Sequence, residues 1–185
     1  MRSVFLLALV GLVLAQPWAH PGFSATYHQT VKNTGLLALR GKSLDIYVTY
    51  EVIRVNGTKV TFRIYGNATI VTTKSTTKTI NTTITVNPNW KNVSLPFLTE
   101  SKFKELLEKA PHNCTGDICT FTLNLTQSLP GHNMLIVFKG YEKIDKNLLI
   151  LQEAELTTKV YMVKGTTKRL IGTSVSTIEL LKYKK

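Results

Sequence analysis

Cysteine and acidic residues are scarce in this chain of 185 residues, and each shortage excludes a class of protein. Two cysteines are too few for a small scaffold in which disulfides replace a core. Asp and Glu number 11 against 23 Lys and Arg, and the excess is mostly lysine spread along the chain. Because 43% of the residues are apolar, wholesale disorder is also excluded, and the length suits one ordinary domain.

The motifs of common enzyme classes are also missing. The chain contains no G-x-S-x-G, no H-E-x-x-H, no phosphate-binding loop and no G-x-G-x-x-G. Glu153 and Glu155 are spaced to share a strand face, and such a pair can cleave glycosides, but nearby lysines favour solvated surface charges. We therefore expect no catalytic residue and no cofactor, and an exported hydrolase stays an alternative.

The N-terminal segment predicts export. One positive charge at Arg2 precedes an apolar run over 4–14, which is shorter than the roughly 20 residues needed to span a bilayer. We expect a secretory signal peptide over 1–15, cleaved after Ala15, with Ala19 as the weaker cleavage site and an uncleaved anchor as the alternative. No other apolar run approaches a span, so no transmembrane segment is expected after cleavage.

Six Asn-x-Ser/Thr acceptors indicate the same compartment, because this motif is glycosylated in secreted proteins. The predicted glycosylation sites are Asn56, Asn67, Asn81, Asn92, Asn113 and Asn124. Asn81 and Asn124 fall on the polar side of strands assigned independently, so their sugars would point away from the core.

Alternation with a period of two predicts strands through most of the chain. The alternation over 44–52, followed by Asn56-Gly57 and a second strand over 59–65, predicts a hairpin with a type I′ turn. Thr, Ile and Val enrich 68–86, which suits a pleated sheet. Further strands are predicted over 118–126, 134–144, 148–156, 158–164 and 175–182.

One helix is predicted over 99–110, capped by Thr99 and ended by Pro111. Phe103, Leu106 and Leu107 belong to its apolar stripe and are candidates to cover an apolar ligand.

Successive strands with one helix predict a mainly β fold, either an antiparallel β-sandwich or a curved half-barrel, with that helix covering it. The predicted organisation is the signal peptide, an extended N-terminal arm over 16–35 and a single antiparallel β domain over 36–185.

Cys114 and Cys119 belong to the most specific local pattern. If Gly116-Asp117 forms a two-residue turn, the two cysteines face each other at a closely spaced antiparallel pair, which suits a disulfide. The alternative is a zinc site in which His132 is the third ligand and His112 completes the four. The fourth His of a zinc finger is missing from its usual place, however, and an exported cysteine pair oxidises more often. We predict a Cys114–Cys119 disulfide and no metal.

The lysines occur singly on polar strand faces and at the C-terminal end, without the grouped aromatics of nucleic-acid binders. No specific nucleic-acid binding is therefore expected. The charge predicts affinity for anionic cell-surface material, and the other candidate partners are surface proteins or copies of this chain.

The short signal, the many Asn-x-Thr acceptors, the strands rich in Thr, Val and Ile, and the preference for Lys over Arg resemble small exported glycoproteins of thermophilic archaea. The terminal strand over 174–182 shares this style, although no motif specifies a family. Some such proteins look like donor-strand filament subunits, and the resemblance implies that 16–32 would be the arm that completes a neighbour's sheet.

The leading hypothesis is a secreted or cell-surface N-glycosylated β-domain protein with a structural or adhesive, non-catalytic role. The alternatives are an extracellular carrier that binds a lipid or other apolar ligand between the curved sheet and the helix, a donor-strand filament subunit, and the exported hydrolase.

Overall fold

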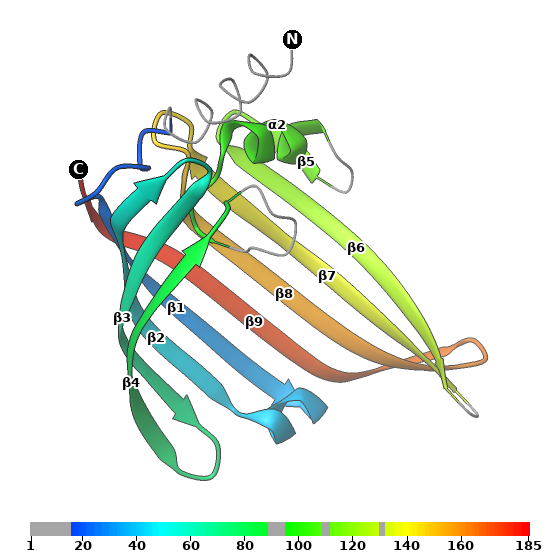
Figure 1. Cartoon of the computed structure of the whole chain (residues 1–185). Helices are drawn as coiled ribbons and strands as arrows, with labels where there is room; N and C mark the ends of the chain where they lie inside the picture. Colours follow the sequence, from blue (N-terminus) through cyan, green and yellow to red (C-terminus); the bar gives the residue numbers. More distant parts are fainter. Residues whose placement is uncertain (1–15, 89–94, 109–111, 130–131) are drawn as a thin grey trace.

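The computed structural model describes residues 16–88, 95–108, 112–129 and 132–185. Nine antiparallel strands form one open sheet, in the order β4-β3-β2-β1-β9-β8-β7-β6-β5 (Figure 1). The strands are β1 (Ser24–Gly35), β2 (Ser43–Asn56), β3 (Lys59–Val71), β4 (Ser75–Val86), β5 (His112–Thr115), β6 (Ile118–Leu129), β7 (His132–Asp145), β8 (Ile150–Lys164) and β9 (Thr167–Lys184). The predicted mainly β, antiparallel class is confirmed.

The predicted β-sandwich is wrong, because the described residues form one sheet and no second layer of strands. The strands are long, up to 18 residues in β9, and the sheet is strongly curved (Figure 1). Bulges interrupt the register in four pairs of strands, between β1 and β9, β2 and β3, β7 and β8, and β8 and β9. Bulges increase local twist and bending, which is how a single sheet acquires an inner and an outer face.

The β2–β3 hairpin forms at the predicted turn. Asn56 pairs with Lys59, and Gly57 has a φ of 57°, a conformation that suits glycine because it lacks a Cβ atom. The predicted alternation of β2 is also confirmed, since Val48 and Val52 are buried while Tyr47 is exposed on the opposite face.

The segment predicted as an extended arm lies partly inside the sheet. Its second half is β1, which pairs with β2 on one side and with β9 on the other. The chain therefore closes its N-terminal strand against its C-terminal strand in the middle of the sheet. No free arm is formed by Ser24–Gly35, so this strand is not available to complete a neighbour's sheet.

The hydrophobic core occupies one end of the inner face. Trp18, Phe23, Tyr27 and Phe62 are fully buried there, together with Phe97 from the segment that follows β4. The segment before β1 and the residues around Phe97 close this end, where Phe97 bridges to Ile150 at the start of β8. We call this the core end of the sheet and the opposite end the far end.

A row of paired residues divides the two ends. The row crosses all nine strands, and each residue is the Cα partner of the next. Its members are Thr77, Thr69, Asp45, Thr30, Thr177, Glu155, Tyr141, Thr120 and Asn113. We call it the middle row. It lies on the outer face, where threonine pairs such as Thr30 and Thr177 bond at 2.8 Å.

The predicted helix is present as α2 (Glu100–Glu108), but it does not cover the sheet. Thr99 caps it as expected, since its hydroxyl oxygen accepts a hydrogen bond from the Lys102 N–H at 3.3 Å. The helix lies at the core end beside β5 (Figure 1). The reason is that Phe103 packs against the core cluster, which fills only that end of the inner face.

No helix within the described ranges has the length and apolar character needed to cross a bilayer.

Candidate functional site

The inner face remains apolar beyond the core, towards the far end. On β6, Leu123 pairs with Phe138 of β7, and Leu125 pairs with Ile136. Ile136 in turn pairs with Val160 of β8, so these side chains share one face. We call these five residues the inner apolar patch.

The inner apolar patch is separate from the hydrophobic core. None of its residues belongs to the core cluster. Val160 is buried, but Leu123 and Leu125 leave 42% and 48% of their surface exposed. Contiguous exposed apolar side chains on a sheet face are costly in water and typically mark a binding surface.

Gly140 lets an aromatic ring lie flat next to this patch. It pairs with Phe121 of β6 and Leu156 of β8 on the inner face. A Cβ atom here would lie 2.2 Å from the Glu155 carbonyl oxygen and 3.0 Å from the Phe121 ring. Only glycine fits, so the Phe121 ring lies across the strand and extends the apolar surface.

The helix side chains that were expected to cover a ligand are placed only in part. Phe103 is half-buried and packs against the core cluster. The side chains of Leu106 and Leu107 lie outside the described part of the chain. Phe103 therefore contributes to packing at the core end, away from the inner apolar patch.

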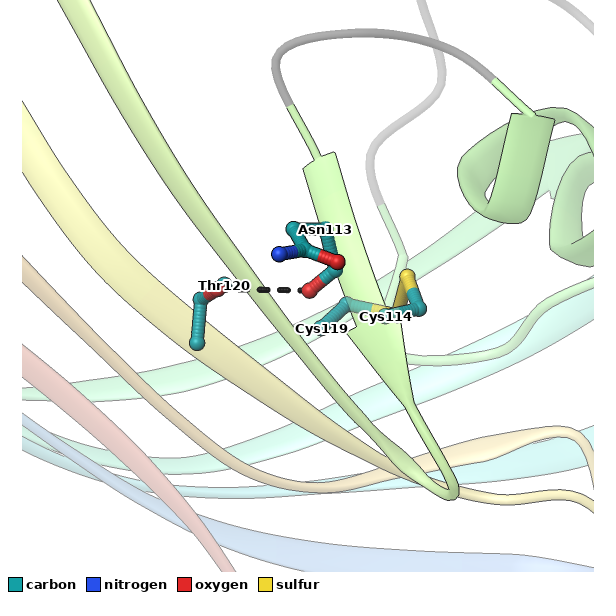
Figure 2. Close-up of a disulfide and its surroundings, with 4 residues drawn as sticks. All are labelled: Asn113, Cys114, Cys119 and Thr120. Atoms are coloured by element: carbon teal, nitrogen blue, oxygen red, sulfur yellow. Dashed lines mark hydrogen bonds between the residues drawn. A yellow bond between two sulfur atoms is a disulfide. The ribbon is translucent and has the colours of Figure 1, made fainter.

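The predicted disulfide joins Cys114 of β5 to Cys119 of β6 (Figure 2). The two residues are direct Cα partners 4.0 Å apart, and the Thr120 hydroxyl donates to the Asn113 carbonyl oxygen beside them. With both sulfurs bonded to each other, these cysteines do not form the zinc alternative, and the described residues hold no cluster of three or more metal-ligating side chains.

Four predicted glycosylation sites lie on the outer face. Register places Asn67 opposite Tyr47, Asn81 opposite Tyr65, and both Asn113 and Asn124 on the same side. All four are exposed, as is Asn56 beside the β2–β3 turn. Asn92 lies outside the described residues. Any sugars at the four strand sites would leave the inner face uncovered.

The predicted carboxylate pair also lies on the outer face. Glu153 pairs with Lys143 and Glu179, and Glu155 pairs with Tyr141 and Thr177. The Tyr141 hydroxyl donates a hydrogen bond to Glu153 Oε1, and this bond, with burial and the charge of Glu155 adding to it, raises the pKa of Tyr141 to about 12. One carboxylate of the pair is therefore engaged by a tyrosine.

Charge is distributed very unevenly between the two ends. None of the 11 acidic residues, all of which belong to described segments, lies beyond the middle row towards the far end. Exposed basic residues lie there instead, and we call them the cationic rim. They are Lys32, Lys42, Lys74, Lys139, Lys159, Lys164, Lys168 and Arg169.

Sequence reasoning missed two parts of this arrangement. Alternation identified Leu123 and Leu125 as apolar residues on one face, but it carries no signal for whether that face is covered. The short 3₁₀ helix η1 (Leu36–Arg40) at the far end was also missed. A leucine-rich stretch between Gly35 and Gly41 was the signal that could have marked it.

No protein-family model and no curated protein sequence matches this chain. A solved acyl-CoA hydrolase from Agrobacterium tumefaciens is similar over 97% of this chain and 86% of that chain, at 10% sequence identity and a TM-score of 0.19. A similarity at this level assigns neither fold nor activity.

Proposed function

We propose that this protein is an exported, N-glycosylated carrier that holds the hydrocarbon chain of an anionic lipid against the inner face of its sheet. The observation that carries the proposal is the inner apolar patch, which continues the apolar inner face beyond the core with Leu123 and Leu125 exposed. Export and glycosylation rest on the N-terminal segment and on the acceptors of the outer face.

The apolar area of the inner apolar patch suits a hydrocarbon chain. Each methylene group of a lipid that leaves water for such a surface contributes about 0.8 kcal/mol, and the leucine side chains contribute in addition. A chain laid along β6 to β8 would cover Leu123, Leu125 and Phe138 together. This differs from the site expected from sequence, because Phe103 packs into the core and the chain would lie further along the sheet.

The charge of the ligand follows from the cationic rim. A chain on the inner apolar patch ends near the far end, where the β8–β9 hairpin carries Lys164, Lys168 and Arg169. No acidic residue of the described chain lies at that end to repel a phosphate or carboxylate. An anionic head group therefore fits better there than a zwitterionic or neutral one.

A saturation experiment with cis-parinaric acid, a fluorescent anionic acyl chain, tests this function on the full secreted protein. We expect saturable binding, competition by oleate and weaker competition by oleyl alcohol. Leu123→Thr combined with Leu125→Thr keeps good strand formers and should weaken binding about tenfold. Val137→Thr makes a similar change on the outer face of β7 and should have no effect. Equal affinities for both variants, or no saturable binding by the wild type, would refute the carrier.

A structural or adhesive role is the second candidate, favoured by β4. This strand is an edge of the sheet, 12 residues long, and carries a single charged residue, Lys78. Edge strands offer unpaired backbone groups to another chain, and copies joined along β4 would form a larger sheet. Thr79→Pro in this edge would abolish assembly seen by light scattering while leaving parinaric acid binding intact. A monomeric wild type at all concentrations would reject assembly through β4.

A further inference from the structure

The cationic rim follows the far edge of the sheet, along which several connections between strands lie. The β3–β4 turn, η1 and the β8–β9 turn all lie at the far end, opposite the C-terminus and α2 (Figure 1). Lys74 lies in the first of these turns, Lys42 follows η1, and Lys164 begins the last. The lysines are scattered in sequence, and the register of the sheet gathers them at one end.

Large apolar side chains protrude among these charges. Leu39 is 82% exposed and Leu36 is 51% exposed, both in η1. Such exposure of leucine is common for single residues, but here it coincides with a surface without acidic groups. Leucines among lysines form the combination that binds the interface of an anionic bilayer.

The backbone around η1 holds these leucines outward. The Asn33 side-chain amide donates to the Gly41 carbonyl oxygen at 2.8 Å, and the Lys42 N–H donates to the Val71 carbonyl oxygen at 2.8 Å. Leu37 packs inward instead, since a Cβ atom at Gly172 would lie 3.1 Å from its Cγ. With Leu37 inward and the ends of η1 tied to the sheet, Leu36 and Leu39 present their side chains to solvent.

We propose that the cationic rim and η1 dock the protein on the surface of an anionic lipid bilayer. Leu36 and Leu39 enter the boundary between head groups and acyl chains, while Lys42, Lys74 and Lys164 lie at the level of the lipid phosphates. This goes beyond the carrier function, because docking requires no bound ligand. It also places the open end of the inner apolar patch next to the source of lipid.

A bilayer fits these observations better than nucleic acid does. Tyr161 lies among the rim lysines, and the Lys168 ammonium covers one face of its ring at 4.1 Å from the ring centroid. A base cannot stack on a ring face that is already covered. Exposed leucines gain nothing from a phosphate backbone, whereas they gain from transfer into lipid.

Co-sedimentation of the full secreted chain with vesicles tests the proposal. Vesicles of phosphatidylcholine alone are compared with vesicles of phosphatidylcholine and phosphatidylglycerol in equal amounts. We expect binding to the second kind only, lost at high salt because the rim charges are screened. Each lysine near an anionic surface strengthens binding about fivefold, so the triple variant K164Q, K168Q and R169Q should bind about a hundredfold more weakly.

A matched variant keeps the charge count equal. K59Q, K182Q and K184Q also remove three exposed positive charges, but at the core end, and should change binding less than about threefold. Leu39→Trp adds a direct reporter, whose emission should shift to the blue and be quenched by brominated lipids on anionic vesicles alone. Equal losses of vesicle binding by the two triple variants would overturn the proposal. So would binding of the wild type to vesicles that contain only phosphatidylcholine. Binding to duplex DNA that depends on the rim residues, without binding to vesicles, would also overturn it.

Lipid binding on the inner apolar patch and docking on a bilayer can be tested independently of each other. The Leu123→Thr and Leu125→Thr variant should lose parinaric acid and keep vesicle binding. Leu36→Ser combined with Leu39→Ser leaves Lys164, Lys168 and Arg169 in place, so this variant should weaken vesicle binding and still bind parinaric acid in solution. Loss of both properties in either variant, with an unchanged circular dichroism spectrum, would contradict the separation of the docking surface from the lipid site.

Discussion

Trp18 donates its indole N–H to the carbonyl oxygen of Leu98 at 2.9 Å, and this bond ties the segment before β1 to the segment before α2. The Trp18 ring is fully buried and lies 5.2 Å from the Phe97 ring and 6.0 Å from the Phe62 ring, centroid to centroid. The Trp18 side chain therefore holds both segments against the core end of the sheet.

Removing this side chain should destabilise the whole domain. Trp18→Ala is expected to lower the free energy of unfolding by about 3–5 kcal/mol, because it leaves a large cavity and an unpaired carbonyl group. Trp18→Phe keeps most of the ring and should cost less. Urea denaturation measures both, and Leu39→Ala, at an exposed position, should change the same free energy by less than about 0.5 kcal/mol. A Trp18→Ala effect as small as that of Leu39→Ala would contradict this role of Trp18.

The same contact bears on signal cleavage. Gln16, Trp18 and Ala19 are all buried, so cleavage after Ala19 would remove residues of the core, whereas cleavage after Ala15 keeps them. We expect the intact mass of the secreted protein, after deglycosylation, to match a chain that begins at Gln16. A mature chain beginning at His20 would be inconsistent with a core closed by Trp18.

The disulfide should contribute a local stability of modest size. Its loop spans five positions of sequence, and the chain-entropy model assigns about 2 kcal/mol to so short a loop. The double variant Cys114→Ser and Cys119→Ser should lose about this amount in urea denaturation and retain the sheet. Amide exchange should rise in β5, which is an edge strand, and hardly change in β1. Uniformly faster exchange across the sheet would show a global role instead.

Local signals in the sequence predicted the parts of the fold that depend on neighbouring residues. Asn56-Gly57 specified the β2–β3 turn, and the short spacing of Cys114 and Cys119 specified their pairing. The stretch 148–164 was predicted as two strands, but 150–164 forms the single strand β8, and Leu148 and Leu149 belong to the turn before it. The strand does not break at Thr157, because Thr157 pairs with Lys139 of β7 and Val175 of β9. These partners cannot be identified from the sequence.

Features of the fold that depend on pairing between residues far apart in the chain were not predicted. The weak alternation of β1, with polar His28 and Gln29 in its middle, predicted an arm because its partners β2 and β9 were unknown. The cationic rim is likewise a product of register, which brings Lys42 and Lys164 to the same end of the sheet. The sequence shows both as isolated lysines, so it predicted a diffuse positive coat and no oriented surface.

Glycans should be restricted to the outer face and the turns. Expression in a host that glycosylates secreted proteins is expected to give a mass above that of the polypeptide, and a deglycosidase should remove the excess. Asn81→Gln and Asn124→Gln should each remove one glycan and change the free energy of unfolding by less than about 0.5 kcal/mol, since both side chains are exposed. Parinaric acid binding should also be unchanged. Loss of binding on deglycosylation would place sugars against the inner face.

The hydrogen bond from Tyr141 to Glu153 should make the stability of the protein depend on pH at high pH. This bond raises the pKa of Tyr141 from 10.0 to about 12 in the folded protein, because a phenol that donates to a carboxylate holds its proton more firmly. The unfolded chain releases the same proton near 10. The contribution to stability is therefore fully present below pH 10 and is lost as the pH rises through about 12.

Absorbance of tyrosinate measures this pKa directly, as the difference between the wild type and Tyr141→Phe. Glu153→Gln removes the charged acceptor and should move the pKa of Tyr141 down towards 10.0, its ordinary value. Glu179→Gln is the matched control, because Glu179 pairs with Glu153 across β8 and β9 but is not the hydrogen-bond partner of Tyr141. If Glu179→Gln lowered the pKa of Tyr141 as much as Glu153→Gln, the general negative charge of this surface would be the cause, and the hydrogen bond would not.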